Sequence, residues 1–143
     1  MQTMYPTMFR KVRGVTYART RIETPDNDFL DIDRSCIGST RAAVVLHGLE
    51  GDSGRSYVLG MVRALNRGGW DAIAVNFRGC SGEPNRQPRL YHSGETGDVG
   101  LVVDLLIRKG GYQELALVGF SLGGNVILKY LGEQGTSVHP EIK

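Results

Sequence analysis

The most constraining feature of this sequence is a Gly-x-Ser-x-Gly motif formed by Gly119, Ser121 and Gly123. An apolar run, residues 115–118, precedes the motif, and a run with helical spacing, residues 125–131, follows it. A serine between a strand and a helix in this pattern is typical of a nucleophile elbow, a turn so sharp that the hydroxyl projects from the end of the sheet. Side chains two residues either side of the serine would collide in such a turn, so glycine is favoured there. The motif predicts a nucleophilic serine; a serine that only caps a helix is the alternative.

The rest of the chain predicts a sheet for this turn to sit on. Residues 42–46, 72–77 and 115–120 are short apolar runs of the kind that form strands buried on both faces. Residues 58–67 and 99–107 have helical spacing and lie between these runs. Alternating strands and helices give right-handed crossovers, so we predict an α/β fold, a mostly parallel sheet with helices on both faces.

The length of 143 residues suits about one domain, and we find no repeat, linker or low-complexity tract within residues 1–143. Residues 19–24 and 29–33 are predicted to form a hairpin, because residues 25–28 have the composition of a turn. The basic residues Arg10, Lys11 and Arg13 are interpreted as a solvated surface patch.

Composition argues against several classes of function. The net charge of +2 is too small to favour nucleic acid or an anionic membrane as partner. Two cysteines, Cys36 and Cys80, give no disulfide framework, which favours a reduced, cytoplasmic setting. No secretory signal is visible, and no run approaches the roughly 18 apolar residues that a membrane-spanning helix needs. Nothing in the composition indicates an oligomeric state.

Neither a metal nor a nucleotide cofactor is predicted. No group of His, Cys and Asp residues has the spacing of metal ligands. Gly48, Gly51 and Gly54 follow a predicted strand, but their spacing differs from that of a dinucleotide-binding loop, and Asn76 stands where that fold uses an acid.

Parallel strands carry their sites at their carboxyl ends, so His47, Arg78 and Ser121 are expected to gather on one face. Ester chemistry at Ser121 needs main-chain donors for an oxyanion. The N–H of Leu122 opens the helix after the serine, and the loop after residues 42–46 supplies a second donor, for which the Leu49 N–H is preferred over that of Glu50. His47 is interpreted as holding this loop in place rather than as the catalytic base.

The residues downstream of Ser121 do not complete a catalytic triad. Glu133 lies 12 residues along the following helix, so roughly 18 Å away at ~1.5 Å per residue. His139 and Glu141 fall where the chain would enter its next strand, at the opposite end of the sheet. His139 is therefore expected to be a surface loop residue. His92 lies in a loop that begins at the carboxyl ends of the strands, and we interpret it as stabilising that loop.

Two further interpretations concern the polar loop and the helix after it. Asp98 is read as a helix-terminal charge and Cys80 as a small loop residue.

Four segments carry a more specific pattern: residues 47–51 (HGLEG), 76–86 (NFRGCSGEPNR), 91–96 (YHSGET) and 119–125 (GFSLGGN). Together they resemble the YheT-type α/β-hydrolases, esterase-like proteins related to the animal α/β-hydrolase-domain lipases. The likeness runs from Gln2 to the last residue, and the long central segment is more specific than the elbow alone.

The resemblance implies an α/β-hydrolase fold and hydrolysis of small-molecule carboxylic esters by a Ser-Asp-His triad without a cofactor, with Ser121 as nucleophile. The loops carrying His47, Gly48, Arg78 and His92 would shape the site. Family members place their triad Asp and His further along the chain, so residues 1–143 are expected to be the N-terminal part of the domain, ending after the helix that follows the elbow.

One expectation concerns residues 1–143 on their own, and one alternative concerns the function. Without a strand beside residues 115–120, that strand would be a bare apolar edge, so the piece alone is expected to be poorly soluble and almost inactive. A non-catalytic hydrolase-fold module that binds a ligand or partner is the alternative function.

Overall fold

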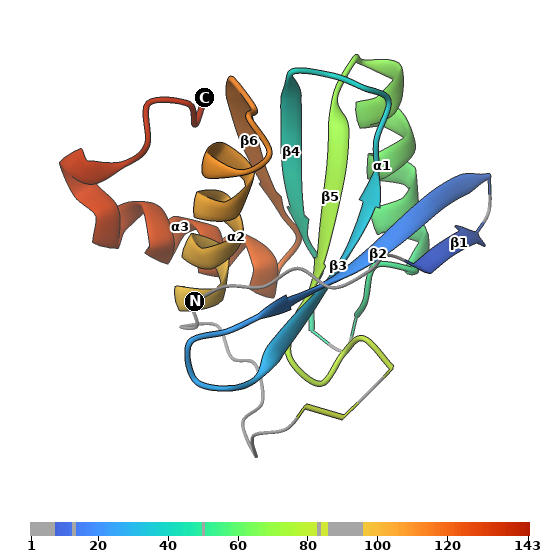
Figure 1. Ribbon diagram of the computed structural model, residues 1–143, viewed down its shortest axis with the longest axis horizontal. Helices are drawn as coiled ribbons and strands as arrows, with labels where there is room; N and C mark the ends of the chain where they lie inside the picture. The colour runs from blue at the N-terminus through green and yellow to red at the C-terminus, as the bar shows by residue number, and fades with distance from the viewer. Residues whose placement is uncertain (1–7, 13, 50, 83, 86–95) are drawn as a thin grey trace.

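A mixed β-sheet forms the centre of the computed structural model, which describes residues 8–12, 14–49, 51–82, 84–85 and 96–143. Within these ranges the sheet has six strands, in the order β1-β2-β3-β5-β4-β6 (Figure 1). The strands are β1 (Met8–Val12), β2 (Val15–Glu23), β3 (Phe29–Ser35), β4 (Arg41–Leu46), β5 (Asp71–Asn76) and β6 (Glu114–Gly119). The helices are α1 (Ser56–Arg67), α2 (Gly97–Arg108) and α3 (Leu122–Gln134), followed by the short 3-10 helix η1 (Gly135–Ser137).

The predicted α/β architecture is confirmed, and the sheet divides into two halves. Strands β5, β4 and β6 pair in parallel, as predicted from their continuous apolar runs. Strands β2 and β3 form the predicted hairpin, and β3 joins the parallel half through an antiparallel pairing with β5. Strand β1 was not predicted; it includes Arg10 and Lys11, which the sequence analysis assigned to a surface patch with Arg13. The side chains of Arg10 and Lys11, and the whole of Arg13, lie outside the described structure.

Helices cover both faces of the sheet, because the side chains of each buried strand alternate between two cores. Helix α1 lies on one face, and α2 and α3 lie on the other (Figure 1). In β5, Ile73 and Val75 pack in the core under α2 and α3, whereas Ala72 and Ala74 pack in the core under α1. The continuous apolar runs of the parallel strands are thus explained by burial on both sides.

Each helix extends beyond its predicted range. Helix α3 begins directly after Ser121, at Leu122, as expected, and it ends three residues beyond the predicted run, at Gln134. Leu122 is half-buried, whereas Gly123 is buried. Gly68 is the C-cap of α1, and the left-handed conformation falls on the next residue, Gly69, with φ of 88°.

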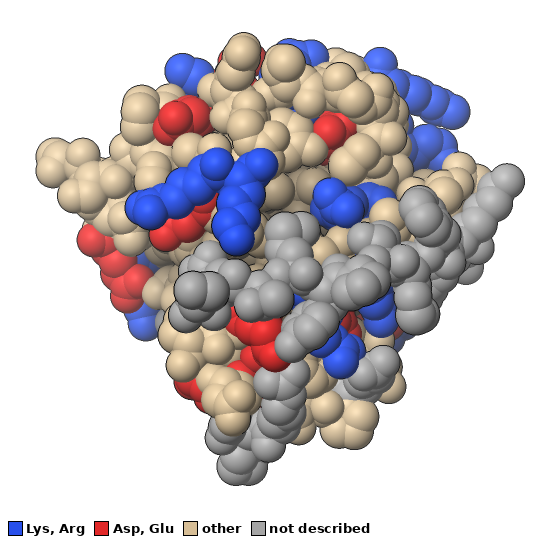
Figure 2. Space-filling view, in the orientation of Figure 1, with Lys and Arg blue, Asp and Glu red and all other residues tan. Residues whose placement is uncertain are grey.

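Strand β6 lies at one edge of the described sheet. At its amino end, the Leu115 N–H donates to the Glu141 carbonyl (2.7 Å), and the Lys143 N–H donates to the Leu115 carbonyl (2.9 Å). Leu115 and Ile142 form a parallel bridge, so residues 141–143 begin to pair beside β6. Basic and acidic side chains are interspersed on the face of the molecule seen in Figure 2, in keeping with the small net charge.

Candidate active site

Ser121 occupies the sharp turn between β6 and α3. Its backbone has φ of 52° and ψ of −109°, and its side chain is exposed. Among the described residues, only Asn27 and Ser121 combine a side chain with a positive φ. Such a conformation costs on the order of 1–3 kcal/mol and persists only where the surrounding structure enforces it. Asn27 lies in the β2–β3 turn, whereas Ser121 is at the end of the sheet where parallel strands carry their sites.

Gly119 and Gly123 are the residues that allow this turn. A Cβ on Gly119 would lie 2.5 Å from both the Gly123 carbonyl carbon and the Gly124 nitrogen. A Cβ on Gly123 would lie 2.5 Å from the Leu46 carbonyl oxygen. Both contacts are with backbone atoms, which cannot move aside, so the start of α3 packs directly on the end of β4. The sequence-based reason for glycine at these two positions matches the geometry found.

The loop after β4 lies against Ser121. A Cβ on Gly48 would lie 3.3 Å from the Phe120 carbonyl oxygen and 3.6 Å from the Ser121 Cβ. Leu49 follows with 69% of its surface exposed. Within the described ranges, neither the Leu49 N–H nor the Leu122 N–H has a hydrogen-bond acceptor. Two main-chain donors are therefore available on the segments that flank the serine.

His47 is buried and uses both ring nitrogens. Its Nε2 accepts a hydrogen bond from the Phe77 N–H (3.0 Å), and its Nδ1 lies 2.7 Å from the Gly48 carbonyl oxygen. Because Nε2 accepts, Nδ1 carries the proton and donates it to Gly48. Burial lowers the pKa of His47 below its usual value of 6.5. A neutral histidine fixed in this way joins the ends of β4 and β5 and leaves no nitrogen to accept a proton from Ser121.

The depressed pKa of His47 predicts a pH dependence of stability. Below about pH 6.5 the unfolded chain binds a proton at His47 that the folded chain resists, so stability falls as the pH falls. We expect the free energy of unfolding to decrease between pH 7.5 and pH 5.5, and the His47→Asn variant to show a smaller decrease. Urea titrations at both pH values measure this difference; an identical decrease in the two proteins would contradict it.

A second group of residues anchors the far end of the loop after β4. Tyr17 donates to the Ser53 carbonyl oxygen (2.8 Å), and the Ser53 N–H donates to Asn76 Oδ1 (2.9 Å). The Ser53 hydroxyl donates to Asp33, which also accepts two hydrogen bonds from Arg19. These hydrogen bonds outweigh the effect of burial and hold the pKa of Asp33 below its usual range. No local sequence pattern marks this network, because its members come from four separate segments.

Arg78 is buried, with 4% exposure, and is held by three carboxylates. Two of its nitrogens donate to Asp98 (2.9 and 2.8 Å), two contact Asp26 (2.7 and 3.2 Å), and one lies 3.5 Å from Asp28. Burial alone would lower the pKa of Arg78, but the hydrogen bonds that Arg78 donates to Asp98 and Asp26 outweigh the effect of burial and raise the pKa. The interpretation of Asp98 as a helix-terminal charge is confirmed, because Asp98 lies in the first turn of α2. Its buried carboxylate, with 5% exposure, also fixes the start of α2 to Arg78.

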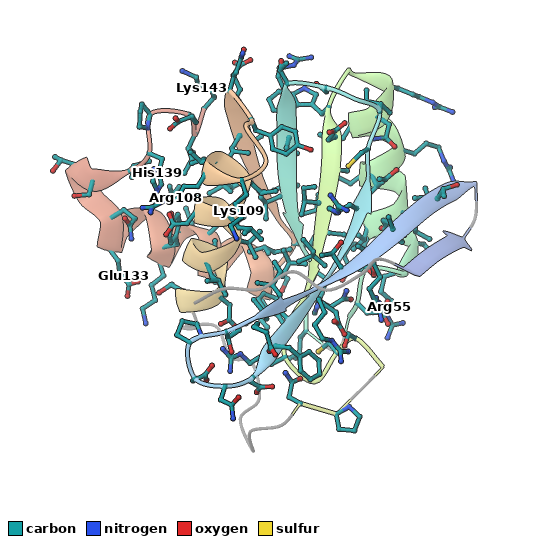
Figure 3. All side chains as sticks on the ribbon, in the orientation of Figure 1. Arg55, Arg108, Lys109, Glu133, His139 and Lys143 are labelled. Atoms are coloured by element: carbon teal, nitrogen blue, oxygen red, sulfur yellow. The ribbon has the colours of Figure 1, made fainter. Side chains whose placement is uncertain are left out.

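The acids and the histidine downstream of Ser121 lie elsewhere, as expected. Glu133 accepts a hydrogen bond from Thr96 near the start of α2, and His139 Nε2 lies 2.8 Å from Asp104 Oδ1. Figure 3 shows Glu133 and His139 on the α2 and α3 side of the molecule, away from the carboxyl ends of the parallel strands. The prediction that His139 is a surface loop residue needs one addition, because it is partly buried by its contact with Asp104.

Two of the residues considered for the site, His92 and Glu50, lie outside the described residues. Cys36 and Cys80 are not joined to each other by a disulfide. Within the described ranges no cluster of His, Cys, Asp and Glu could hold a metal ion. None of the helices described there is long and apolar enough to cross a membrane.

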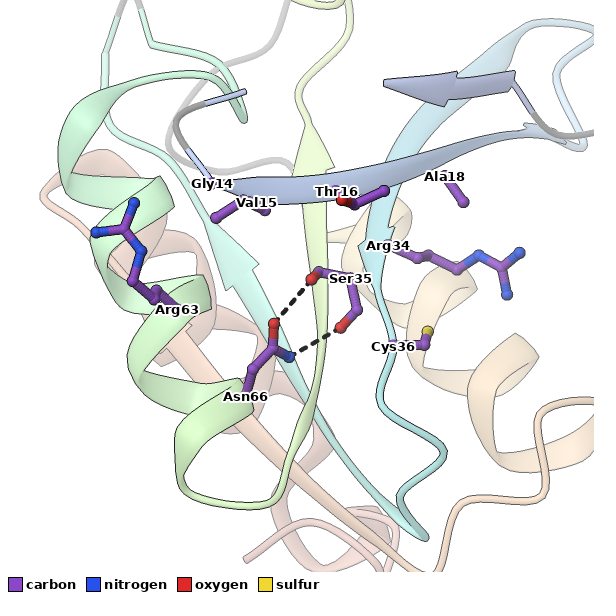
Figure 4. Close-up of a pocket in the computed structure, with 9 residues that line it drawn as sticks. All are labelled: Gly14, Val15, Thr16, Ala18, Arg34, Ser35, Cys36, Arg63 and Asn66. Carbon is purple, nitrogen blue, oxygen red and sulfur yellow. Dashed lines mark hydrogen bonds between the residues drawn. The ribbon is translucent and has the colours of Figure 1, made fainter. Parts of the chain in front are cut away.

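A cavity of about 500 Å³ lies at the opposite end of the sheet from Ser121 (Figure 4). Ser35 and Asn66 are joined there by two hydrogen bonds (2.8 and 3.0 Å). Ser35 ends β3 and pairs with Ala72 at the start of β5, so this cavity is far from the carboxyl ends of the parallel strands. None of the predicted site residues that the structure describes lines it.

Comparison with known proteins identifies the family. Residues 43–140 match the model of the alpha/beta hydrolase fold. The chain is 41% identical over 142 residues to the Escherichia coli protein named "Putative esterase YheT", covering 96% of this chain and 42% of that protein. It is 31% identical to the monoacylglycerol lipase of Saccharomyces cerevisiae, covering 90% of this chain and 28% of that protein. It therefore spans less than half the length of these curated relatives.

The fold comparison agrees. The esterase Pf2001 of Pyrococcus furiosus superposes with a TM-score of 0.72 at 23% identity, over 88% of this chain and 48% of that chain. At this identity the match bears on the fold alone, and the fold agrees with the sequence comparison. The resemblance drawn from the four motifs is confirmed, and the chain belongs to the alpha/beta hydrolase fold family, with YheT among its relatives.

Proposed function

We propose that this chain carries the nucleophile and oxyanion site of a serine hydrolase acting on carboxylic esters. The observation that carries the proposal is Ser121, an exposed serine held at a positive φ between β6 and α3. The loop after β4 supports it, because Gly48 lies against Ser121 and the Leu49 and Leu122 N–H groups have no acceptor among the described residues. The relatives named as esterase and lipase make ester hydrolysis the reaction class favoured.

In the proposed reaction, Ser121 Oγ attacks the ester carbonyl carbon and gives its proton to a base. The carbonyl oxygen becomes an oxyanion that accepts hydrogen bonds from the Leu49 and Leu122 N–H groups. Collapse of this intermediate breaks the bond to the alcohol, which leaves with the proton, and forms an acyl ester on Ser121. Water then attacks the acyl group, releases the acid and restores the serine hydroxyl.

The base in this scheme lies outside the described residues. His47 uses both nitrogens for backbone groups, and His139 is paired with Asp104. These contacts support the interpretation that His47 holds the proposed oxyanion loop in place. Because two cysteines in residues 1–143 give no disulfide framework, we also propose a reducing, cytoplasmic location for the enzyme.

A substrate panel tests the reaction class. With the natural-length protein, p-nitrophenyl esters of short carboxylic acids should be hydrolysed, whereas p-nitrophenyl phosphate and a p-nitroanilide should not. Phosphate release without ester hydrolysis would contradict the proposal.

Residues 1–143 alone should hydrolyse a p-nitrophenyl ester barely above background, because no base is positioned at Ser121 among the described residues. The piece should also be poorly soluble, since most of the outer edge of β6 has no paired strand among the described residues. Turnover by the purified 143-residue chain, and its disappearance in a Ser121→Ala version, would show that a base is present and overturn this expectation.

A further inference from the structure

Tyr57 lies at the start of α1, and its hydroxyl contacts the loop beside Ser121. The Tyr57 hydroxyl oxygen accepts a hydrogen bond from the Gly48 N–H (2.9 Å). Its ring packs edge-on against the ring of Phe120, with ring centroids 4.8 Å apart. Tyr57 therefore contacts the residue before Ser121 and the residue before Leu49 at the same time. Tyr57 is 40% exposed, so it lies at the surface beside the carboxyl ends of the parallel strands.

The space around Gly48 brings this hydroxyl close to the serine. The position that a Cβ on Gly48 would occupy lies 3.5 Å from the Tyr57 hydroxyl oxygen and 3.6 Å from the Ser121 Cβ. Both side chains thus border one small space next to the Gly48 backbone. The peptide that joins Gly48 to Leu49 carries the proposed oxyanion donor, so its orientation decides where the Leu49 N–H points.

Three contacts fix the Gly48 backbone from different sides. Tyr57 accepts from its N–H, and His47 Nδ1 donates to its carbonyl oxygen. The Gly51 N–H donates to the same carbonyl oxygen (3.1 Å). The carbonyl contacts come from within the loop itself, whereas Tyr57 ties the loop to α1 and, through Phe120, to the nucleophile turn.

We propose that Tyr57 is a positioning residue for the reaction, which orients the Gly48–Leu49 peptide toward Ser121 through its hydrogen bond with the Gly48 N–H. This inference rests on the proposed function. The role is indirect, because the hydroxyl acts through the main chain of the loop. It predicts that loss of the hydroxyl weakens stabilisation of the oxyanion more than binding of the ester.

The first test is Tyr57→Phe in the natural-length protein, with p-nitrophenyl acetate as substrate. This variant keeps the ring that packs on Phe120 and removes only the hydroxyl. Misplacing one oxyanion donor should lower kcat by roughly 10- to 100-fold, with little change in KM. Tyr112→Phe is the matched control, because it removes a hydroxyl that donates to Asp71 (2.6 Å) at the other end of the sheet. It should leave kcat unchanged.

Gly51→Ala provides a second, independent variant. A Cβ on Gly51 would lie 2.7 Å from the Tyr57 hydroxyl oxygen and would displace it. Since both substitutions disturb the same hydrogen bond, kcat of the double variant should fall by less than the product of the two single losses.

The outcomes separate this inference from the function on which it rests. A lower kcat at constant KM in Tyr57→Phe, with non-multiplicative behaviour in the double variant, supports the positioning role. Wild-type kcat in Tyr57→Phe, or equal losses in Tyr57→Phe and Tyr112→Phe, would overturn it while an inactive Ser121→Ala variant leaves the proposed function intact. Full turnover by Ser121→Ala would overturn the proposed function and this inference with it.

Discussion

Replacing Ser121 with alanine is expected to lower kcat for a carboxylic ester by about 10⁴- to 10⁶-fold in the natural-length protein, since the acyl group then has no nucleophile. The substitution removes one oxygen atom and keeps the Cβ, so the backbone at φ of 52° meets no new steric demand. The free energy of unfolding should therefore stay within about 0.5 kcal/mol of the wild-type value. Steady-state kinetics together with a urea titration measure both quantities.

The control for this variant is Ser137→Ala. Ser137 is an exposed serine in η1, on the segment that follows α3. Its replacement should leave kcat unchanged. If Ser121→Ala kept most of the wild-type activity, the serine would be only a helix-capping residue, which is the alternative raised by the sequence.

Arg78→Met is expected to destabilise the fold by about 3–5 kcal/mol, the cost typical of breaking a buried ion pair by removing one partner. The substitution leaves Asp28 and Asp98 buried, with 0% and 5% exposure, and removes the cation that pairs with them. The substitution should also raise the pKa of Asp26, because hydrogen bonds from Arg78 and Thr24 hold that pKa well below its usual range. Urea-induced unfolding at pH 7 gives the difference in free energy directly.

Arg41→Met is a matched control for Arg78→Met. Arg41 donates to the backbone carbonyl of Gly68 (2.9 Å) and stacks on Trp70. Unlike Arg78, it is only half-buried and has no carboxylate partner among the described residues. Its loss should cost about 1 kcal/mol or less. Equal destabilisation by the two substitutions would show that the carboxylates around Arg78 are not held by its charge.

The parallel half of the fold could be predicted from sequence because local signals there agree. Buried strands read as continuous apolar runs, and the two glycines around Ser121 mark a turn that admits no Cβ. Strand β1 carries no such signal, because it is a short strand at the edge of the sheet with basic residues among its five.

The contacts that support the candidate site could not be predicted from sequence patterns. Asp98 has the position of an ordinary helix-terminal acid, and only the fold brings Arg78 from the end of β5 to meet it. Tyr57 fits the start of an amphipathic helix, so nothing marks its hydroxyl as a partner of Gly48. Both depend on contacts between residues separated in the chain, which spacing rules do not encode. The one available hint was that Tyr57, which carries a hydroxyl, closely follows the glycine-rich loop in the sequence.

The central claim is that Ser121 is the nucleophile, and peptide mapping after reaction with a fluorophosphonate probe tests it most directly. The natural-length protein is labelled, digested and analysed by mass spectrometry. We predict that the added mass is found on the peptide containing Ser121, at that residue, and that Ser121→Ala is not labelled. Labelling of another serine in the wild-type protein, with Ser121 unmodified, would contradict the account.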